Sequence, residues 1–156
     1  MGNGKFQGEL PITRAMVAAV LMRISVDKNI YTESSFTDVK HGDWYNEAVK
    51  WAADKGLVVG YTDGPFKPNK LLTRQELAVI LQKFLALHGI NMDEVKAWTY
   101  SDLDKVPAWS KDAVVAIAKI SLVDGQTDTM YNPTSEFTRE ELAVMLYKII
   151  RWVETH

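Results

Sequence analysis

Cysteine is absent from this chain of 156 residues, so disulfide bonds and thiolate-bound metal sites are excluded. The sequence also lacks any apolar run close to the roughly 18 residues that a membrane-spanning helix needs. Its longest candidate, Ala15–Met22, is short and has an arginine on either side. Like charges form no run and the net charge is -2, whereas a nucleic-acid-binding protein needs a basic stripe. With 47% hydrophobic residues, the chain can still bury a core.

Signs of catalysis or metal binding are missing as well. His41, His88 and His156 share no spacing with one another or with an acidic cluster. The segments YTDG and QTDT lack the alternating oxygen ligands of a calcium loop. We therefore expect no enzyme, no metal and no cofactor. The first residues, MGNGKF, lack the regions of a signal peptide, so we expect the export signal of a secreted parent protein to lie upstream.

What the sequence does contain is an internal repeat. A Thr-Arg pair occurs three times, and its arginines, Arg14, Arg74 and Arg139, are 60 and 65 residues apart. Apolar residues follow each arginine at +3, +6, +7 and +10, which is the stripe of an amphipathic helix. A small residue lies beside each stripe, four residues after the arginine: Ala18, Ala78 and Ala143.

The second and third copies match over a longer stretch. Trp44 and Trp109 each precede their arginine by 30 residues and begin an amphipathic segment, which predicts a further helix in each copy. Gly56 is placed to end the first of these helices in a left-handed conformation, whereas Ser121 is a poorer stop. Matched glycines then predict tight bends: Gly60 and Gly125.

The arginine of each Thr-Arg pair is the least expected residue of the repeat. Thr-x-x-Glu is a capping box, in which both side chains satisfy backbone N–H groups; Thr73–Glu76 and Thr138–Glu141 fit it, while Met16 replaces the acid in the first copy. The box does not require an arginine, because a cation at a helix start is disfavoured by roughly 0.3–1 kcal/mol. A planar guanidinium beside unpaired N–H groups is a good carboxylate receptor. The alternative is a structural ion pair with an upstream aspartate.

Together these segments resemble a known family. FTDV, the tryptophan, VGYTDGPFKP and LTRQELAVIL are similar to the S-layer homology (SLH) repeat, whose pattern runs F-x-D-V, Trp, a G-x-x-x-G turn, D-G-x-F-x-P and I-T-R-A-E. The resemblance covers a half-repeat at 1–26 and full repeats at 36–88 and 98–156. It implies an all-α fold of tandem helix-loop-helix repeats that form a pseudo-threefold helical bundle in one compact domain. Departures from the pattern are Met16, Tyr131 for Phe, Thr129 for Gly and Gly8 for Pro.

The resemblance also implies a function. SLH modules are noncovalent anchors on the bacterial cell surface, outside the cell, and bind anionic, often pyruvylated, secondary cell-wall polysaccharide in grooves between repeats. A groove combines the T-R-x-E helix start of one repeat with the Trp segment of the next, so Arg74 would face Asp102 and Trp109. Arg139 would need the N-terminal half-repeat or another molecule. The expected ligand-binding residues are Arg14, Asp38, Trp44, Gly60, Arg74, Glu76, Asp102, Trp109, Gly125, Arg139 and Glu141.

Simpler interpretations stay open for several of these residues. Trp44 and Trp109 can be core residues, Asp38 and Asp102 can be local helix or loop caps, and the matched glycines can serve only the turns. Because Met16 replaces the acid of the first groove, we expect the Arg74 groove to be the principal site. Two further functions remain possible: a protein–protein or self-assembly module, self-associating through the incomplete first repeat, and the non-catalytic anchor of a surface glycoside hydrolase. We expect neither nucleic acid nor a membrane span.

Overall fold

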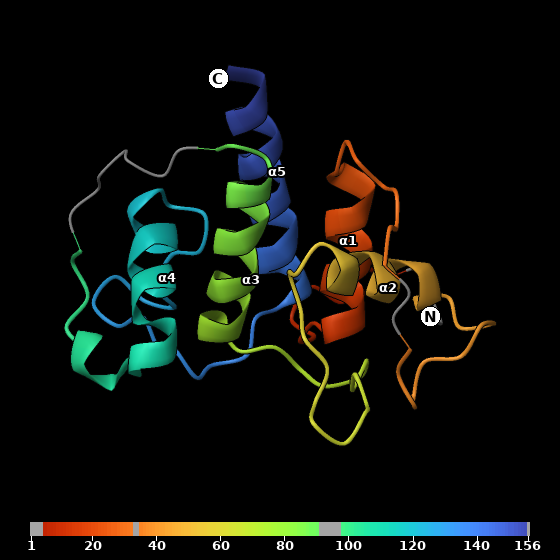
Figure 1. Cartoon of the computed structure of the whole chain (residues 1–156). Helices are drawn as coiled ribbons and strands as arrows, with labels where there is room; N and C mark the ends of the chain where they lie inside the picture. The colour runs from red at the N-terminus through yellow and green to blue at the C-terminus, as the bar shows by residue number, and fades with distance from the viewer. Residues whose placement is uncertain (1–4, 33–34, 91–97, 156) are drawn as a thin grey trace. The chain divides into compact units, whose positions relative to one another are not determined.

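The computed structural model describes residues 5–32, 35–90 and 98–155, so parts of the stretches expected between the repeats, 27–35 and 89–97, lie outside the described residues. Over these ranges the chain is helical and contains isolated bridges but no strand, which confirms the all-α prediction. The helices are α1 (Arg14–Ile24), α2 (Asn46–Asp54), α3 (Arg74–Leu87), η2 (Leu103–Lys105, a 3-10 helix), α4 (Ala108–Lys119) and α5 (Arg139–Thr155) (Figure 1).

The chain divides into two compact units that do not follow the repeats. One unit comprises Met1–Ile12, Leu72–Val79 and Met92–His156, and the other comprises Thr13–Leu71 and Ile80–Asn91. Helix α3 gives its start to one unit and its end to the other. Within the second unit, α1 and α2 pack against each other (Figure 1). The repeat boundaries and the pseudo-threefold bundle stay predictions.

Taken together, most residues of the apolar stripes behind the three arginines are buried, as the helical periodicity predicts. Helices α1, α3 and α5 each contribute core residues at these spacings: Val17, Leu21, Leu77, Ile80, Leu81, Phe84, Leu142, Met145 and Ile149.

The three Thr-Arg segments begin their helices with capping boxes. Thr73 N donates to Glu76 Oε2 at 3.0 Å, and Glu76 N donates back to Thr73 Oγ1 at 3.3 Å. Thr138 and Glu141 repeat this arrangement. In α1 the thioether of Met16 lies 3.5 Å from Thr13 N and takes the place of the carboxylate. Because sulfur is a weak acceptor, this box is the weakest of the three.

The residues two positions before the arginines form a closed ring of backbone hydrogen bonds. Ile12 N donates to Phe137 O at 2.8 Å, Phe137 N donates to Leu72 O at 3.0 Å, and Leu72 N donates to Ile12 O at 3.1 Å. All three side chains are buried. The ring therefore joins the segments that lead into α1, α3 and α5.

The matched glycines serve a different purpose from the one predicted. Neither Gly60 nor Gly125 has a positive φ. A Cβ at Gly60 would instead lie 2.6 Å from Phe36 Cε1, and a Cβ at Gly125 would collide with the ring of Tyr100. Each glycine thus makes room for the aromatic residue that opens its repeat, which corrects the tight-bend interpretation.

The predicted helix stops behave as expected. Gly56 follows the C-cap of α2 with φ +68°, and Ser121 holds the equivalent left-handed position after α4 with φ +57°. A serine has a Cβ and pays a steric cost there that a glycine avoids.

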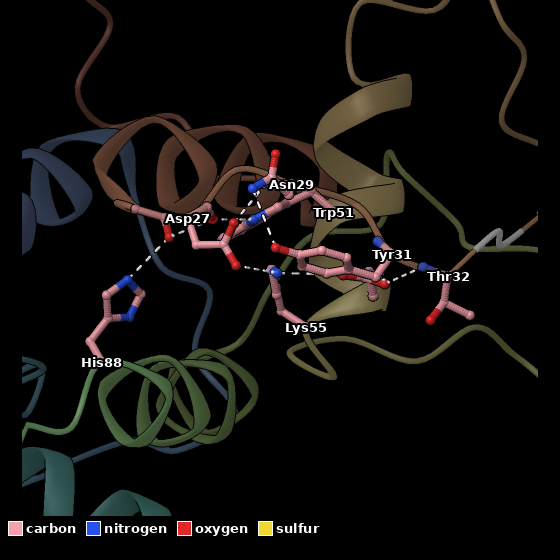
Figure 2. A network of polar contacts seen from close by, with 9 residues as sticks. Asp27, Asn29, Tyr31, Thr32, Trp51, Lys55 and His88 are labelled. Atoms are coloured by element: carbon pink, nitrogen blue, oxygen red, sulfur yellow. Dashed lines mark hydrogen bonds and ion pairs between the residues drawn. The ribbon is translucent and has the colours of Figure 1, made fainter.

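Within the second unit, the segment after α1 is held in place by contacts of Asp27 (Figure 2). Trp51 Nε1 donates to Asp27 O at 3.0 Å, and Lys55 Nζ pairs with Asp27 Oδ2 at 2.7 Å. Ser25 Oγ donates to Asp27 O at 3.1 Å and lies 3.1 Å from His88 Nε2. The hydrogen bond from Lys55 lowers the pKa of Asp27 below its ordinary value, and the same bond raises the pKa of Lys55.

A second set of contacts holds the chain at Tyr31 and Thr32. Asp54 Oδ1 accepts from Tyr31 N at 3.1 Å and from Thr32 N at 2.6 Å. Burial raises the pKa of Asp54, but these hydrogen bonds and nearby Lys55 outweigh that effect and the pKa is lowered overall. Residues 25–32, which follow α1, are therefore held in place by these contacts, which the sequence did not predict.

Candidate functional site

The guanidinium of Arg74 is fixed by the third repeat. Its Nη1 donates to Glu141 Oε1 at 2.5 Å, and its Nη2 donates to the main-chain oxygen of Asp124 at 2.6 Å. The ring of Phe137 lies 5.2 Å from Cζ. Arg74 is 3% exposed, whereas the side chain of Glu141 is 32% exposed. The arginine that opens α3 is thus already used as a carboxylate receptor, and its partner is a downstream glutamate rather than the upstream aspartate considered above.

Arg14 occupies the corresponding place in the second unit. Its Nη2 donates to Val59 O at 2.9 Å and its Nε donates to Phe66 O at 3.0 Å. The rings of Phe66 and Tyr61 lie 4.5 Å and 5.4 Å from Cζ. Val59 and Asp124 are equivalent, since each lies 15 residues before the arginine of its own repeat. The unexpected arginine at a helix start therefore reaches a loop carbonyl of the following repeat.

Each Thr-Arg helix also presents its first two N–H groups to the loop of another repeat. The pattern is the same each time, because the acceptors lie four and six residues before an arginine. In α1, Arg14 N donates to Lys70 O and Ala15 N donates to Pro68 O. In α3, Arg74 N donates to Ser135 O and Gln75 N donates to Pro133 O. In α5, Arg139 N donates to Leu10 O and Glu140 N donates to Gly8 O. The last pair joins the third repeat to the N-terminal half-repeat. The N–H groups that were expected to help bind an anion are therefore occupied, and of the expected carboxylate receptor only the guanidinium is left.

Asp38 and Asp102 hold these loops from within their own repeats. Asp38 accepts from Phe66 N at 2.7 Å and Lys67 N at 2.8 Å. Asp102 accepts from Tyr131 N and from Asn132 N, both at 2.9 Å, and is 2% exposed. Both aspartates thus hold N–H groups of a loop that lies 28 to 30 residues further on, so they are not the local caps considered above; their contact with a ligand stays a prediction.

The tryptophans at the start of the first α-helix of each full repeat, two residues before α2 and at the second residue of α4, are exposed. Trp44 is 69% exposed and Trp109 is 61% exposed, so the core interpretation is wrong for both; the buried tryptophan is Trp51. Trp109 precedes Ser110, whose Oγ donates to Gln75 Oε1 at 3.3 Å. The starts of α4 and α3 therefore adjoin. An exposed indole suits stacking on a sugar ring.

The structure thus brings some predicted site residues together and separates others. Arg74 and Glu141 are paired, Asp102 supports the loop behind them, and Trp109 lies at the neighbouring helix start. Glu76 is occupied by its capping box. Asp124 and Tyr131 belong to the site and were not predicted, because a main-chain acceptor leaves no mark in the sequence. Over the described residues, no group of three or more histidine or acidic side chains could hold a metal.

Comparison with known proteins identifies the family of this arrangement. The sequence model of the S-layer homology domain matches residues 35–78 and 99–143, which is more than half of the chain. The chain belongs to the S-layer homology domain family. Both SLH matches include the aspartate, tryptophan and Thr-Arg segments described above.

Proteins similar to this chain include surface-layer proteins and an enzyme. The "Amylopullulanase" of Thermoanaerobacterium thermosulfurigenes is 29% identical over 152 residues, which are 96% of this chain and 8% of the relative. The "S-layer protein" of Bacillus licheniformis is 30% identical over 135 residues, 86% of this chain and 14% of the relative. The "Surface-layer 125 kDa protein" of Lysinibacillus sphaericus is 30% identical over 155 residues, 97% of this chain and 13% of the relative.

These findings make the chain an SLH module of a cell-surface protein. The chain spans only 8% to 14% of the length of these relatives. In the part of the chain that the structure describes, none of the helices has the length and apolarity needed to cross a membrane.

Proposed function

We propose that this SLH module anchors its parent protein noncovalently to the bacterial cell wall, outside the cell, by binding an anionic, pyruvylated secondary polysaccharide. One observation carries the proposal: the Arg74 guanidinium is held by the Asp124 carbonyl and pairs with a partly exposed carboxylate, Glu141. A carboxylate from a ligand fits the same donors. The exposed indole of Trp109 supplies the stacking surface beside them.

Binding at this site needs only a local change. Glu141 is also held by Thr138 N at 2.9 Å, so its carboxylate can keep the capping box while its contact with Arg74 is released. Arg74 Nη2 stays on Asp124 O and keeps the guanidinium oriented. A charge-assisted hydrogen bond contributes about 1.5–3 kcal/mol, so several sites on one polymer chain are needed for firm anchoring.

The Arg14 and Arg139 sites are further candidates for the same polymer. Arg14 spends two donors on main-chain carbonyls, and Met16 replaces the acid of its capping box, so we expect weaker binding there. Arg139 lies at the contact with the N-terminal half-repeat. The parent protein can equally be a surface-layer protein or a surface glycoside hydrolase, for which this module is the non-catalytic anchor.

The test is a pull-down of the chain with purified cell-wall sacculi, before and after acid extraction of the secondary polymer. Binding that is lost on extraction supports the proposal. Unchanged binding to the extracted sacculi would show that peptidoglycan is the receptor and would contradict it. In the same assay Arg74→Ala should bind more weakly, and Lys119→Ala, which removes the same charge at the far end of α4 from Trp109, should bind like the wild type.

A second function, self-association, is favoured by one face of α5. Val144, Tyr147 and Ile150 follow at a spacing of three and are 50%, 65% and 47% exposed. The alanine beside them, Ala143, is also exposed, although its equivalents in α1 and α3 are buried. Light scattering after size-exclusion chromatography tests this function: a dimer that Tyr147→Glu dissociates would support it, and a wild-type monomer at high concentration would exclude it.

A further inference from the structure

Among the described residues of the Arg74 site, two buried donor groups have no hydrogen-bond partner. They are Arg74 Nε and the hydroxyl of Tyr131, which belong to residues that are 3% and 0% exposed. Burial raises the pKa of the Tyr131 phenol, and the charge of Arg74 acts on it in the opposite direction, as expected for neighbouring groups. At neutral pH the hydroxyl therefore keeps its proton and can donate a hydrogen bond.

The corresponding site around Arg14 has neither of these groups. Phe66 occupies the position of Tyr131 and is also 0% exposed, so the fold accepts a phenylalanine there. Arg14 Nε donates to the main-chain oxygen of Phe66 at 3.0 Å. The main-chain oxygen of Tyr131 instead accepts from Gln126 N at 3.3 Å. Compared with the Arg14 site, the Arg74 site thus has an additional hydroxyl, that of Tyr131, and an arginine Nε–H that donates to no acceptor among the described residues.

The surroundings hold the Tyr131 hydroxyl in place. The rings of Trp98 and Tyr100 each lie 5.5 Å from the Tyr131 ring, and Tyr131 N is bonded to Asp102. A buried hydroxyl without a partner destabilises a fold, and a phenylalanine would avoid that cost. Packing alone therefore gives no reason for a tyrosine at this position.

We propose that Tyr131 is a specificity-determining residue of the Arg74 site: its hydroxyl and Arg74 Nε donate together to one carboxylate of an acidic sugar polymer. The inference rests on the proposed function and adds the residue that distinguishes this site from the Arg14 site. Glu141, whose side chain is 32% exposed, is the group that moves to admit the ligand.

The test compares Tyr131→Phe with the wild type by calorimetric titration and thermal melting. The probe is the wall polymer released enzymatically from sacculi, used intact and after chemical reduction of its carboxyl groups. We expect Tyr131→Phe to bind the intact polymer about threefold to tenfold more weakly, the effect of losing one hydrogen bond. For the carboxyl-reduced polymer we expect no difference between the two proteins. The melting temperature of Tyr131→Phe should rise by about 2–4 °C, because a buried unpaired group is removed.

Tyr100→Phe provides the matched control for stability. The Tyr100 hydroxyl accepts from Gly125 N at 2.7 Å, so its removal should lower the melting temperature, whereas the removal of the Tyr131 hydroxyl should raise it. A wild-type chain that binds neither form of the polymer overturns the proposed function, and this inference with it. If the wild type and Tyr131→Phe bind the intact polymer with equal affinity, this inference alone is overturned.

Discussion

Replacing Asp102 with asparagine separates the structural role of this residue from the ligand role that the sequence suggested. Both carboxylate oxygens of Asp102 accept main-chain hydrogen bonds at 2.9 Å, from Tyr131 and Asn132, and the residue is 2% exposed. An asparagine keeps one acceptor oxygen and turns its NH2 group toward the other N–H. One hydrogen bond is then lost and a buried N–H is left without an acceptor.

The expected loss follows from these contacts. A hydrogen bond to a charged group contributes about 1.5–3 kcal/mol, and leaving a buried N–H unpaired costs about 1–3 kcal/mol. The two terms overlap because they concern the same N–H, so we expect Asp102→Asn to lower the free energy of unfolding by about 2–4 kcal/mol. For a chain of this size the melting temperature should fall by roughly 4–16 °C.

Urea denaturation followed by circular dichroism measures this change, and Asp38→Asn is the matched control. Asp38 makes the same two contacts but is half-buried, so water can compensate and the loss should be smaller. An Asp102→Asn variant that unfolds within about 0.5 kcal/mol of the wild type, yet no longer binds the wall polymer, would refute the reasoning. It would show that the carboxylate serves the ligand rather than the loop.

Three other changes test separate parts of the structure. Gly125→Ala should destabilise the fold by about 1–3 kcal/mol, because the new Cβ would lie 2.8 Å from Met130 O and collide with a ring; a melting temperature equal to that of the wild type would contradict this. Arg74→Ala should weaken binding to the wall polymer about tenfold or more, and Arg14→Ala should weaken it less; titration giving the reverse order would overturn the choice of principal site. The lowered pKa of Asp27 means that its contribution to stability is present above pH 3.8 and is lost as the pH falls through the folded-state pKa. The advantage of the wild type over Asp27→Asn in urea denaturation should therefore shrink as the pH is lowered from neutral into the acid range, and an advantage that does not change with pH would contradict the pairing with Lys55.

Local features of the fold could be predicted from the sequence, because their causes lie within a few residues. The Thr-x-x-Glu spacing predicted the capping boxes of α3 and α5, and the glycine at position 56 predicted the end of α2. The tryptophans were ambiguous, because a large amphipathic side chain at a helix start suits the core and the surface equally well. Only packing decides between them, and it places Trp109 outside the core.

The contacts that build the site could not be predicted, because they join distant segments or use main-chain atoms. Asp102 bonds to residues 29 and 30 positions further on, and Arg74 pairs with a glutamate 67 positions away. The acceptor at Asp124 is a main-chain carbonyl, which every residue type has, so no sequence pattern marks it. The role of Gly125 depends on a ring 25 residues earlier, which the spacing of the glycines alone does not reveal.

The ring of hydrogen bonds through Ile12, Leu72 and Phe137 has a consequence for how the repeats can vary in number. In an open solenoid each repeat contacts only its neighbours, so units can be added or lost at either end and folding can spread from any point. Here each of the three bonds joins a different pair of segments, so two segments alone make one bond and leave a donor and an acceptor unpaired. A fourth segment would find no partner without opening the ring. Three Thr-Arg segments therefore close this ring, and the segment that leads into α1 is as necessary to it as the other two.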